Sequence, residues 1–210
     1  MTYPYNWPMN NLPSPHNANA PMPGGDRDER ISTVEAADNH VYFYADVSSD
    51  RTLQLIRTLR EKDATLRAEA ISRGLESPTP IWLHINSYGG SLFTAFSIAD
   101  QIALLKTPVY SIVEGICASA ATLISLSCSK RYILPNSFML IHQLSSFMWG
   151  THEQFKDEME VQNKLMTRLV NFYTARTKAK EEEIRAMLVR DYWMDADEAL
   201  KRGLVDDVLR

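Results

Sequence analysis

The chain has 210 residues, of which 45% are hydrophobic and 23% are charged, and this composition is ordinary for a folded globular protein. Its formal net charge of -4 at pH 7 gives no electrostatic reason to bind nucleic acid or an anionic membrane surface. The two cysteines, Cys117 and Cys128, are too few for a disulfide scaffold or a cysteine-rich metal site, and their surroundings favour small buried residues.

Residues 1–30 differ in composition from the rest of the chain. They hold six of the ten prolines and many asparagines, so they bury too little apolar surface to offset the entropy of ordering. We predict a flexible N-terminal arm here and one folded domain over residues 31–210. The first 25 residues contain no Lys or Arg, and the longest weakly polar run, "GICASAATLISL", is too short to span a bilayer. A cytoplasmic protein with no membrane partner is therefore expected.

Short apolar runs after the arm predict strands, and segments with helical spacing separate them. The strands are predicted over residues 40–47, 80–86, 108–115, 131–135 and 138–142. Asp50 fits the N-cap of a long helix that ends near Gly74, and a second helix follows "SYGG" up to Leu105. The first helix is expected to bury one face, made of Leu55, Ile56, Leu59, Leu66 and Ala70.

Three further helices are predicted in the last third of the chain. Thr151 opens the first, with Gln154 in the capping-box position; the second covers residues 181–189; and Asp195 caps the third, which stops at Gly203. The helix after Thr151 is expected to bury a stripe made of Phe155, Met159, Met166, Leu169, Val170 and Tyr173. Strands that alternate with helices indicate an α/β domain with a largely parallel sheet.

Ser119 is the first candidate for chemistry. It stands in "GICASAATLI", where a predicted strand runs into a helix, so free N–H groups and the positive end of the helix dipole lie beside its hydroxyl. A hydroxyl so placed can attack a carbonyl while nearby N–H groups hold the oxyanion. A serine that merely caps the helix explains the same pattern.

Gly89 and Gly90 end another predicted strand. Glycines there let a ligand approach the main chain, so the Gly90 N–H is a candidate oxyanion donor together with the Ala120 N–H. An ordinary turn also accounts for the glycine pair.

His142 is the candidate base, because a histidine at the end of a strand can project into a cleft and take the proton of Ser119. A core histidine bonded to a carbonyl is the competing interpretation. Such a base needs an orienting carboxylate, and Asp191 in "VRDYWM" is the best candidate since it can point into the core. The order Ser, His, Asp and the absence of a G-x-S-x-G motif around Ser119 indicate a fold other than the familiar serine-hydrolase folds.

Four blocks of sequence resemble the proteolytic subunit of the Clp protease. They are "INSYGGSLFTAFSIADQI", "GICASAATL", "KRYILPNSFMLIHQ" and "MDADEALKRGLVDDVL", and the similarity runs from about His40 to the C-terminus. The resemblance implies a ClpP/crotonase-type α/β spiral of ββα units with a protruding handle helix. It also implies self-assembly into stacked heptameric rings that enclose the active sites, fed by an AAA+ unfoldase. The subunit itself then needs no metal or organic cofactor, and ATP is used only through the partner.

The same resemblance assigns roles to single residues. Ser119 falls on the family's nucleophile, His142 on its base and Asp191 on its third triad member, while Gly90 and Ala120 fall on the oxyanion-hole positions. The chain is thus expected to be a serine endopeptidase that hydrolyses unfolded polypeptides. It departs from the family pattern where Tyr88 replaces a usual proline, and where "LSS" (144–146) replaces a proline and a glycine pair.

Three alternatives stay open on the sequence. A crotonase-like acyl-CoA enzyme shares the fold and its paired backbone donors. A Ser/Lys hydrolase would use a lysine as base, and Lys130 is the lysine nearest to Ser119 in sequence. A catalytically silent ring subunit would keep these residues without aligning them.

Overall fold

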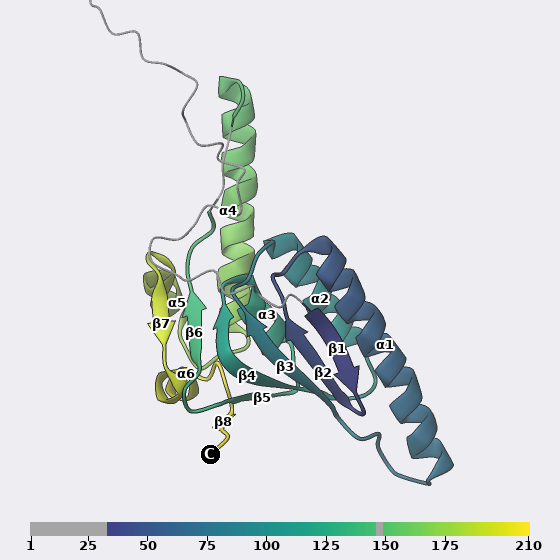
Figure 1. Ribbon diagram of the computed structural model, residues 1–210. Helices are drawn as coiled ribbons and strands as arrows, with labels where there is room; N and C mark the ends of the chain where they lie inside the picture. Colours follow the sequence, from purple (N-terminus) through teal and green to yellow (C-terminus); the bar gives the residue numbers. More distant parts are fainter. Residues whose placement is uncertain (1–32, 146–148) are drawn as a thin grey trace, which may run out of the picture.

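The computed structural model describes residues 33–145 and 149–210 (Figure 1). The predicted N-terminal arm, residues 1–30, lies outside the described residues. Within the described ranges, no helix is both long enough and apolar enough to cross a membrane.

The strands of the described residues form one eight-stranded sheet with the order β1-β2-β3-β4-β5-β8, to which β6 is added through β4 and β7 through β6. Their bounds are β1 Thr33–Ala37, β2 His40–Tyr44, β3 Ile81–Ser87, β4 Val109–Ala118, β5 Lys130–Ile133, β6 Phe138–Ile141, β7 Tyr192–Met194 and β8 Asp207–Val208. Only the β1–β2 and β6–β7 pairs of this described sheet are antiparallel. The predicted α/β class and largely parallel pairing are therefore confirmed.

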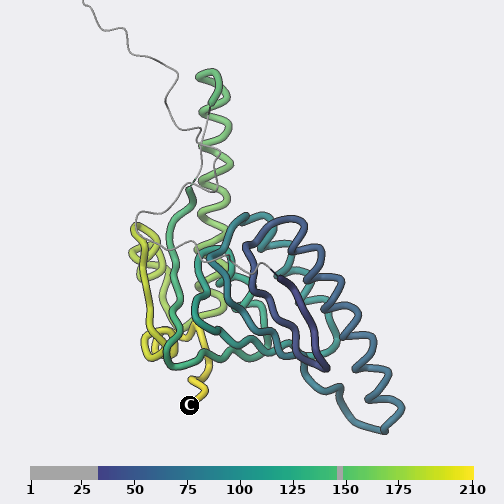
Figure 2. The backbone as a smooth tube through the Cα atoms, viewed as in Figure 1, coloured from purple at the N-terminus to yellow at the C-terminus, as the bar shows by residue number. Residues whose placement is uncertain are grey.

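Helices connect these strands and cover the sheet. Those in the described part of the chain are α1 Ser49–Ser72, α2 Leu92–Leu104, α3 Ala120–Leu126, α4 His152–Thr174, α5 Glu181–Leu188 and α6 Ala196–Arg202. Helices α1, α2 and α3 lie together on one side of the sheet, where the core is built from fully buried residues such as Phe43, Leu59, Leu83 and Leu123 (Figures 1 and 2). This layer fixes the carboxyl ends of β3, β4 and β6 relative to one another.

The helix caps follow the sequence with one exception. Thr151 and Gln154 form the predicted capping box, and Asp195 caps α6, which ends at Gly203 in the left-handed conformation. The N-cap of α1 is Ser48, so the prediction of Asp50 as the N-cap is wrong. Asp50 lies in the first turn, where its negative carboxylate interacts favourably with the positive end of the helix dipole.

The predicted buried stripe of α4 is only half correct. Leu169, Val170 and Tyr173 are buried, but Phe155 is 41% exposed and Met159 56% exposed. The reason is that the first turns of α4 project beyond the sheet, as Figure 1 shows, so the described part of the chain provides no layer for this apolar face to pack against. The helix has the protruding arrangement predicted for a handle, and we call it the handle helix.

Asp63 ties α1 to the loop before β4. Its carboxylate accepts hydrogen bonds from the backbone N–H groups of Lys106 (3.1 Å) and Thr107 (2.7 Å), and Arg67 lies 3.4 Å away. Burial acts to raise the pKa of Asp63, but the hydrogen bonds, led by that from Thr107, outweigh it and hold the pKa below its usual value.

This arrangement gives an acid-dependent contribution to stability. A carboxyl whose pKa is depressed by folding stabilises the protein above its unfolded pKa of about 3.9, and that contribution is lost as the pH falls through the folded value. Asp63→Asn is expected to lower the free energy of unfolding at pH 7 by about 1–2 kcal/mol, measured by urea titration. The difference from wild type should shrink below about pH 4. Asp100→Asn, at an exposed site on α2, is the control, and an Asp63→Asn deficit that stays constant with pH would contradict this interpretation.

Candidate active site

Ser119 and His142 are brought together by two neighbouring parallel strands. Ala118 at the end of β4 pairs with Leu140 of β6, and the Ser119 N–H donates to the Leu140 carbonyl at 2.8 Å. Ser119 directly follows β4, and His142 directly follows β6. Both side chains therefore leave the same carboxyl edge of the sheet, which is where α/β proteins build ligand sites.

Ser119 does not act as a side-chain cap of α3, which is the competing interpretation of this serine. Ser119 is the N-cap residue of α3 by position, yet its side chain makes no capping hydrogen bond. Its φ is 54° and its ψ -127°, and apart from Asp38 it is the only non-glycine residue with positive φ in the described part of the chain. Such a backbone costs about 1–3 kcal/mol and persists only where its surroundings impose it. Ser119 is partly exposed, and its hydroxyl does not cap α3, so the hydroxyl is available for chemistry.

The two glycines after β3 are required by close backbone packing. A Cβ on Gly89 would lie 2.6 Å from the Ala118 carbonyl oxygen and 2.7 Å from the Ser119 Cβ. A Cβ on Gly90 would lie 2.5 Å from the carbonyl oxygen of Val47. Both glycines have positive φ, 95° at Gly89 and 148° at Gly90, and they pack against Ala118 and Val47 respectively. The approach of a ligand to this main chain stays a prediction.

Gly90 and Ala120 carry the two backbone N–H groups that are predicted to bind an oxyanion. Val47 donates its N–H to the Gly89 carbonyl (2.7 Å) and accepts from the Ser91 N–H (2.9 Å), the pattern of a parallel bridge. In such a bridge the residue between the two, Gly90, turns its own N–H to the other side. Ala120 is the first residue of α3, so its N–H has no intrahelical acceptor. Within residues 33–145 and 149–210, neither N–H group donates to a backbone carbonyl outside a regular element, so both stay candidates for binding an anion.

A pocket of about 230 Å³ joins these features. Ser119, His142, Gly90 and Ala120 all line it, so the structure brings four of the five predicted site residues to one cavity. The rest of the wall is mostly apolar and includes Phe93, Leu123, Leu144, Leu165 and Leu169. Sequence patterns did not identify these wall residues as part of a site, because Leu165 and Leu169 come from α4 and only the tertiary fold carries them to Ser119.

Asp191 is the fifth predicted site residue and does not line that pocket. It is exposed, so the expectation that it points into the core is wrong; it precedes β7, at the edge of the sheet. The antiparallel register of β6 and β7 pairs Ile141 with Tyr192, and one further step sets His142 opposite Asp191. Opposed positions on antiparallel strands hold side chains about 5 Å apart. Across the described residues no hydrogen bond joins Ser119, His142 and Asp191, and hydrogen bonds of this kind often form only in the substrate complex.

The other histidines of the sheet are explained by structure. His84 is 8% exposed, its Nδ1 lies 2.7 Å from Glu114 Oε1 and its Nε2 lies 2.8 Å from His40 Nδ1. The Tyr44 hydroxyl donates to the other Glu114 oxygen. These groups satisfy one another on the sheet face away from α1–α3 and have no contact with the Ser119 pocket.

The fold also places the two cysteines, which are buried as predicted, and Lys130, the alternative base. Both cysteines are buried, and burial raises their pKa, that of Cys128 to about 12, so neither supplies a thiolate. Lys130 pairs with Tyr110 near the start of β4, and Ser119 follows the end of that strand. Nine residues at about 3.3 Å each separate the two by roughly 30 Å along the strand, so Lys130 cannot be the base of a Ser/Lys site.

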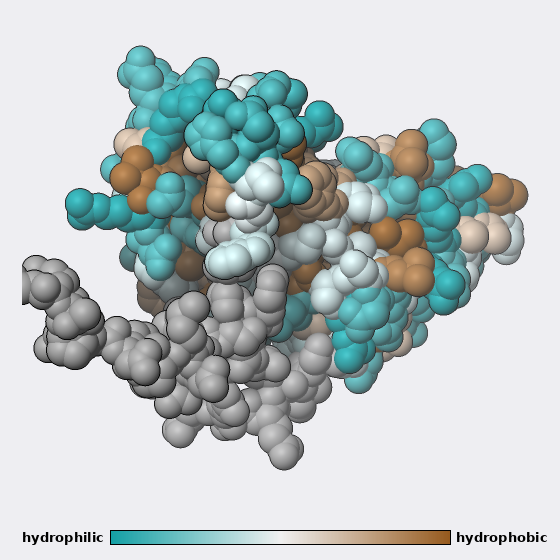
Figure 3. Space-filling model, turned by 90° about the horizontal axis from the view of Figure 1, so that it is seen from above, coloured by the Kyte–Doolittle hydropathy of each residue, from teal (hydrophilic) through white to brown (hydrophobic). Residues whose placement is uncertain are grey.

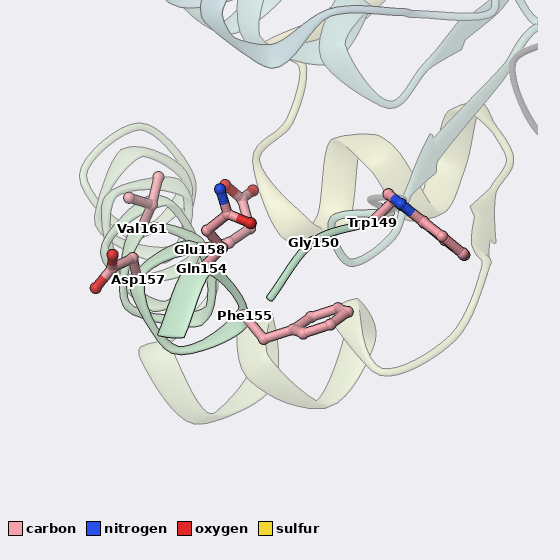
Figure 4. Close-up of a pocket in the computed structure, with 7 residues that line it drawn as sticks. All are labelled: Trp149, Gly150, Gln154, Phe155, Asp157, Glu158 and Val161. Carbon is pink, nitrogen blue, oxygen red and sulfur yellow. The ribbon is translucent and has the colours of Figure 1, made fainter. Parts of the chain in front are cut away.

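A second and wider pocket, of about 430 Å³, lies beside the start of the handle helix. Figure 4 shows the Phe155 ring extending toward the side on which Trp149 lies, while Asp157 and Val161 lie on the other side. None of the predicted site residues lines this pocket. Seen from above, the surface carries hydrophobic residues scattered among hydrophilic ones (Figure 3). Because the wider pocket is lined by the first turns of the handle helix and by Trp149 and Gly150, we treat it as a feature of the handle and not of the Ser119 site.

Known proteins resemble this chain over nearly the whole folded domain. A family model described as Clp protease matches residues 35–210. The ATP-dependent Clp protease proteolytic subunit 2 of Treponema denticola is 31% identical over 159 residues, covering 75% of this chain and 78% of the relative. The ATP-dependent Clp protease proteolytic subunit of Streptococcus mutans is 33% identical over 173 residues, covering 80% and 88%.

A solved structure supports the fold independently. A ClpP1 mutant from Listeria monocytogenes superposes with a TM-score of 0.71 at 24% identity, covering 82% of this chain and 92% of that one. At this identity the likeness shows the fold, which is the predicted ClpP-type α/β fold. Together the matches confirm the family, the fold and the enzyme class, a Clp-type peptidase. This chain belongs to the Clp protease family.

Proposed function

We propose that this chain is the proteolytic subunit of a self-compartmentalised protease and hydrolyses peptide bonds of unfolded polypeptides by serine chemistry. Ser119 is the nucleophile, His142 the general base and acid, and Asp191 the residue that orients the imidazole. The Gly90 and Ala120 N–H groups form the oxyanion hole. The crotonase-like and silent-subunit alternatives gain no support from the family matches.

One observation carries this proposal: Ser119 holds a strained backbone without using its hydroxyl to cap α3, beside a histidine and two free N–H groups in one pocket. A serine with only a structural role would have no reason to keep a positive φ. Ser119 and Ala120 both line that pocket, which supports acyl transfer, since the reaction requires a nucleophile beside an oxyanion donor.

The proposed reaction proceeds through an acyl-enzyme. His142 removes the Ser119 hydroxyl proton as Oγ bonds to the scissile carbonyl carbon, whose oxygen takes the negative charge and accepts from Gly90 and Ala120. The imidazolium, stabilised by Asp191, gives its proton to the leaving nitrogen as the C–N bond breaks. Water then attacks the ester with His142 again as base, releasing the acid and restoring Ser119.

The apolar wall of the pocket sets a preference for the substrate. Phe93, Leu123 and Leu165 offer no charged group to a side chain that enters beside Ser119. Burying an apolar side chain there is favourable, while burying a charged one unpaired is costly. We expect cleavage after apolar residues.

Assembly and partners complete the proposal. The exposed apolar side chains of the handle helix, Phe155, Met159 and Val161, need a covering surface, and a second ring of the same subunit supplies one. Stacked heptameric rings would enclose the Ser119 sites in a chamber in the cytoplasm. An AAA+ unfoldase would then consume ATP to deliver polypeptide, and the subunit would need no cofactor.

Two measurements on the full chain test this function. The purified protein should hydrolyse a fluorogenic peptide with an apolar residue before the scissile bond and should leave an enoyl-CoA unchanged. Its mass in solution should be that of an assembly of many subunits. Turnover of the enoyl-CoA without peptide hydrolysis would support the crotonase-like alternative, and an assembled protein that cleaves no peptide, with or without an unfoldase, would support the silent subunit.

A further inference from the structure

The strained turn at Ser119 needs something to hold it, and Thr122 makes the contacts that do so. The Thr122 N–H donates to the Ser119 carbonyl oxygen at 3.0 Å, and the Thr122 Oγ1 hydroxyl donates to the same oxygen at 2.6 Å. One residue thus fixes one carbonyl through two hydrogen bonds. Thr122 is fully buried, so water does not compete for these bonds.

Tyr173, from the handle helix, decides which way the Thr122 hydroxyl points. Its hydroxyl lies 2.6 Å from Thr122 Oγ1. A threonine hydroxyl has a single proton, and here that proton is directed to the Ser119 carbonyl. Tyr173 must therefore be the donor in the second bond, which leaves one consistent chain of hydrogen bonds from Tyr173 through Thr122 to Ser119. Tyr173 is only 2% exposed, so its hydroxyl cannot bond to bulk water instead, and losing the bond to Thr122 would leave a buried polar group unsatisfied.

The held carbonyl and the Ala120 N–H belong to the same peptide group. A peptide group is planar and trans, so its C=O and N–H point in opposite directions and rotate together. Fixing the Ser119 oxygen therefore fixes the direction of the Ala120 N–H, the proposed oxyanion donor. Without this hold, the peptide plane can turn through opposite changes in ψ of Ser119, which is -127° here, and φ of Ala120, and the direction of the Ala120 N–H is lost.

We propose that Thr122 and Tyr173 are positioning residues that aim the Ala120 N–H at the oxyanion by clamping the Ser119–Ala120 peptide plane. The inference rests on the proposed function of Ser119 and Ala120. It links the handle helix to the chemistry, since a displacement of α4 that moved Tyr173 would release the Thr122 hydroxyl. Tyr173 also lines the Ser119 pocket, but its hydroxyl is bonded to Thr122 Oγ1, and Thr122 does not line that pocket. The pair would therefore act chiefly on the transition state and change the binding of uncleaved substrate little.

Thr122→Val removes the hydroxyl and keeps the shape of the side chain. It is expected to lower kcat for a fluorogenic peptide about 10- to 100-fold, with KM within about twofold of wild type. The reason is that a misdirected N–H donor stabilises the oxyanion little better than an absent donor does. A peptide boronate, whose tetrahedral adduct mimics the oxyanion, should bind more weakly in proportion to the loss of kcat. Thr122→Ser should restore kcat to within about threefold, and Tyr173→Phe should give an intermediate loss of about 3- to 10-fold.

A matched control separates positioning from loss of stability. Ser111 and Ser125 form another buried hydroxyl pair, 2.9 Å apart, that holds the far end of the same α3 helix. Ser125→Ala should destabilise the protein to a similar degree and leave kcat unchanged. An equal loss of kcat in Ser125→Ala, or a folded Thr122→Val with kcat within twofold of wild type, would overturn the inference. A wild-type protein without peptidase activity would instead contradict the proposed function, so the two failures are distinguishable.

Discussion

Replacing Ser119 with alanine is expected to lower kcat for peptide hydrolysis about a million-fold, to the level left by binding and the oxyanion hole alone. The physical reason is that the other candidates are engaged: both cysteines are buried with raised pKa, the Ser91 side chain caps α2, and the Tyr173 hydroxyl is bonded to Thr122. Initial rates with a fluorogenic peptide, normalised to assembled protein, measure the change.

The control for Ser119→Ala is Ser127→Ala. Ser127 is the C-cap of the same helix, and its hydroxyl donates to the Leu123 carbonyl at 2.7 Å, at the end of α3 away from the pocket. Ser127→Ala should keep full activity. Ser119→Ala protein that retains more than about a thousandth of wild-type kcat would show that another group attacks the substrate.

The second large effect is expected at His142. His142→Ala should cost about as much as Ser119→Ala, since a serine hydroxyl without its base is a poor nucleophile. Asp191→Asn should cost less, about 10⁴-fold in kcat, because the imidazole remains but its tautomer and orientation are no longer held. The graded order Ser119 ≈ His142 > Asp191 is what a Ser-His-Asp relay predicts.

Lys130→Ala provides the matching negative result. Lys130 contacts the Tyr110 ring, with Nζ 5.3 Å from its centroid, far from the site, and its removal should leave kcat unchanged. If Lys130→Ala abolished activity while His142→Ala did not, the base assignment would be wrong. If Asp191→Asn were fully active, a different group would orient His142, and Asp191 would have no catalytic role.

The regular elements of the fold could be predicted because their patterns are local. The helix spacing, the Thr151 capping box and the Gly203 stop each lie within a few residues of one another. The sequence patterns do not predict β1, β7 or β8. The three residues of β7 and the two of β8 become strands only by pairing with β6 and β5. The exposed half of α4 does not follow from periodicity, which shows which residues share a face but not what covers that face. The family resemblance, by contrast, predicts a protruding handle helix.

In the candidate site, too, some residues could be predicted from local patterns and others only from the tertiary fold. Ser119, Gly90 and His142 end strands, and strand ends of a parallel sheet share one edge, so their meeting follows from the pattern. Thr122 and Tyr173 are 51 residues apart, and no spacing in the sequence connects them. The exposure of Asp191 also depends on tertiary pairing, because β7 lies at the edge of the sheet and leaves the residue before it open to solvent.

Labelling with a fluorophosphonate, followed by mass spectrometry of the digested protein, tests the central claim most directly. The reagent phosphonylates only a serine whose hydroxyl is activated by a base beside an oxyanion hole, and it needs neither a known substrate nor an unfoldase. We predict a single adduct per subunit, on Ser119, that is lost in His142→Ala. A folded, assembled protein that takes no label, or takes it on another residue, would contradict the assignment of Ser119 as the nucleophile.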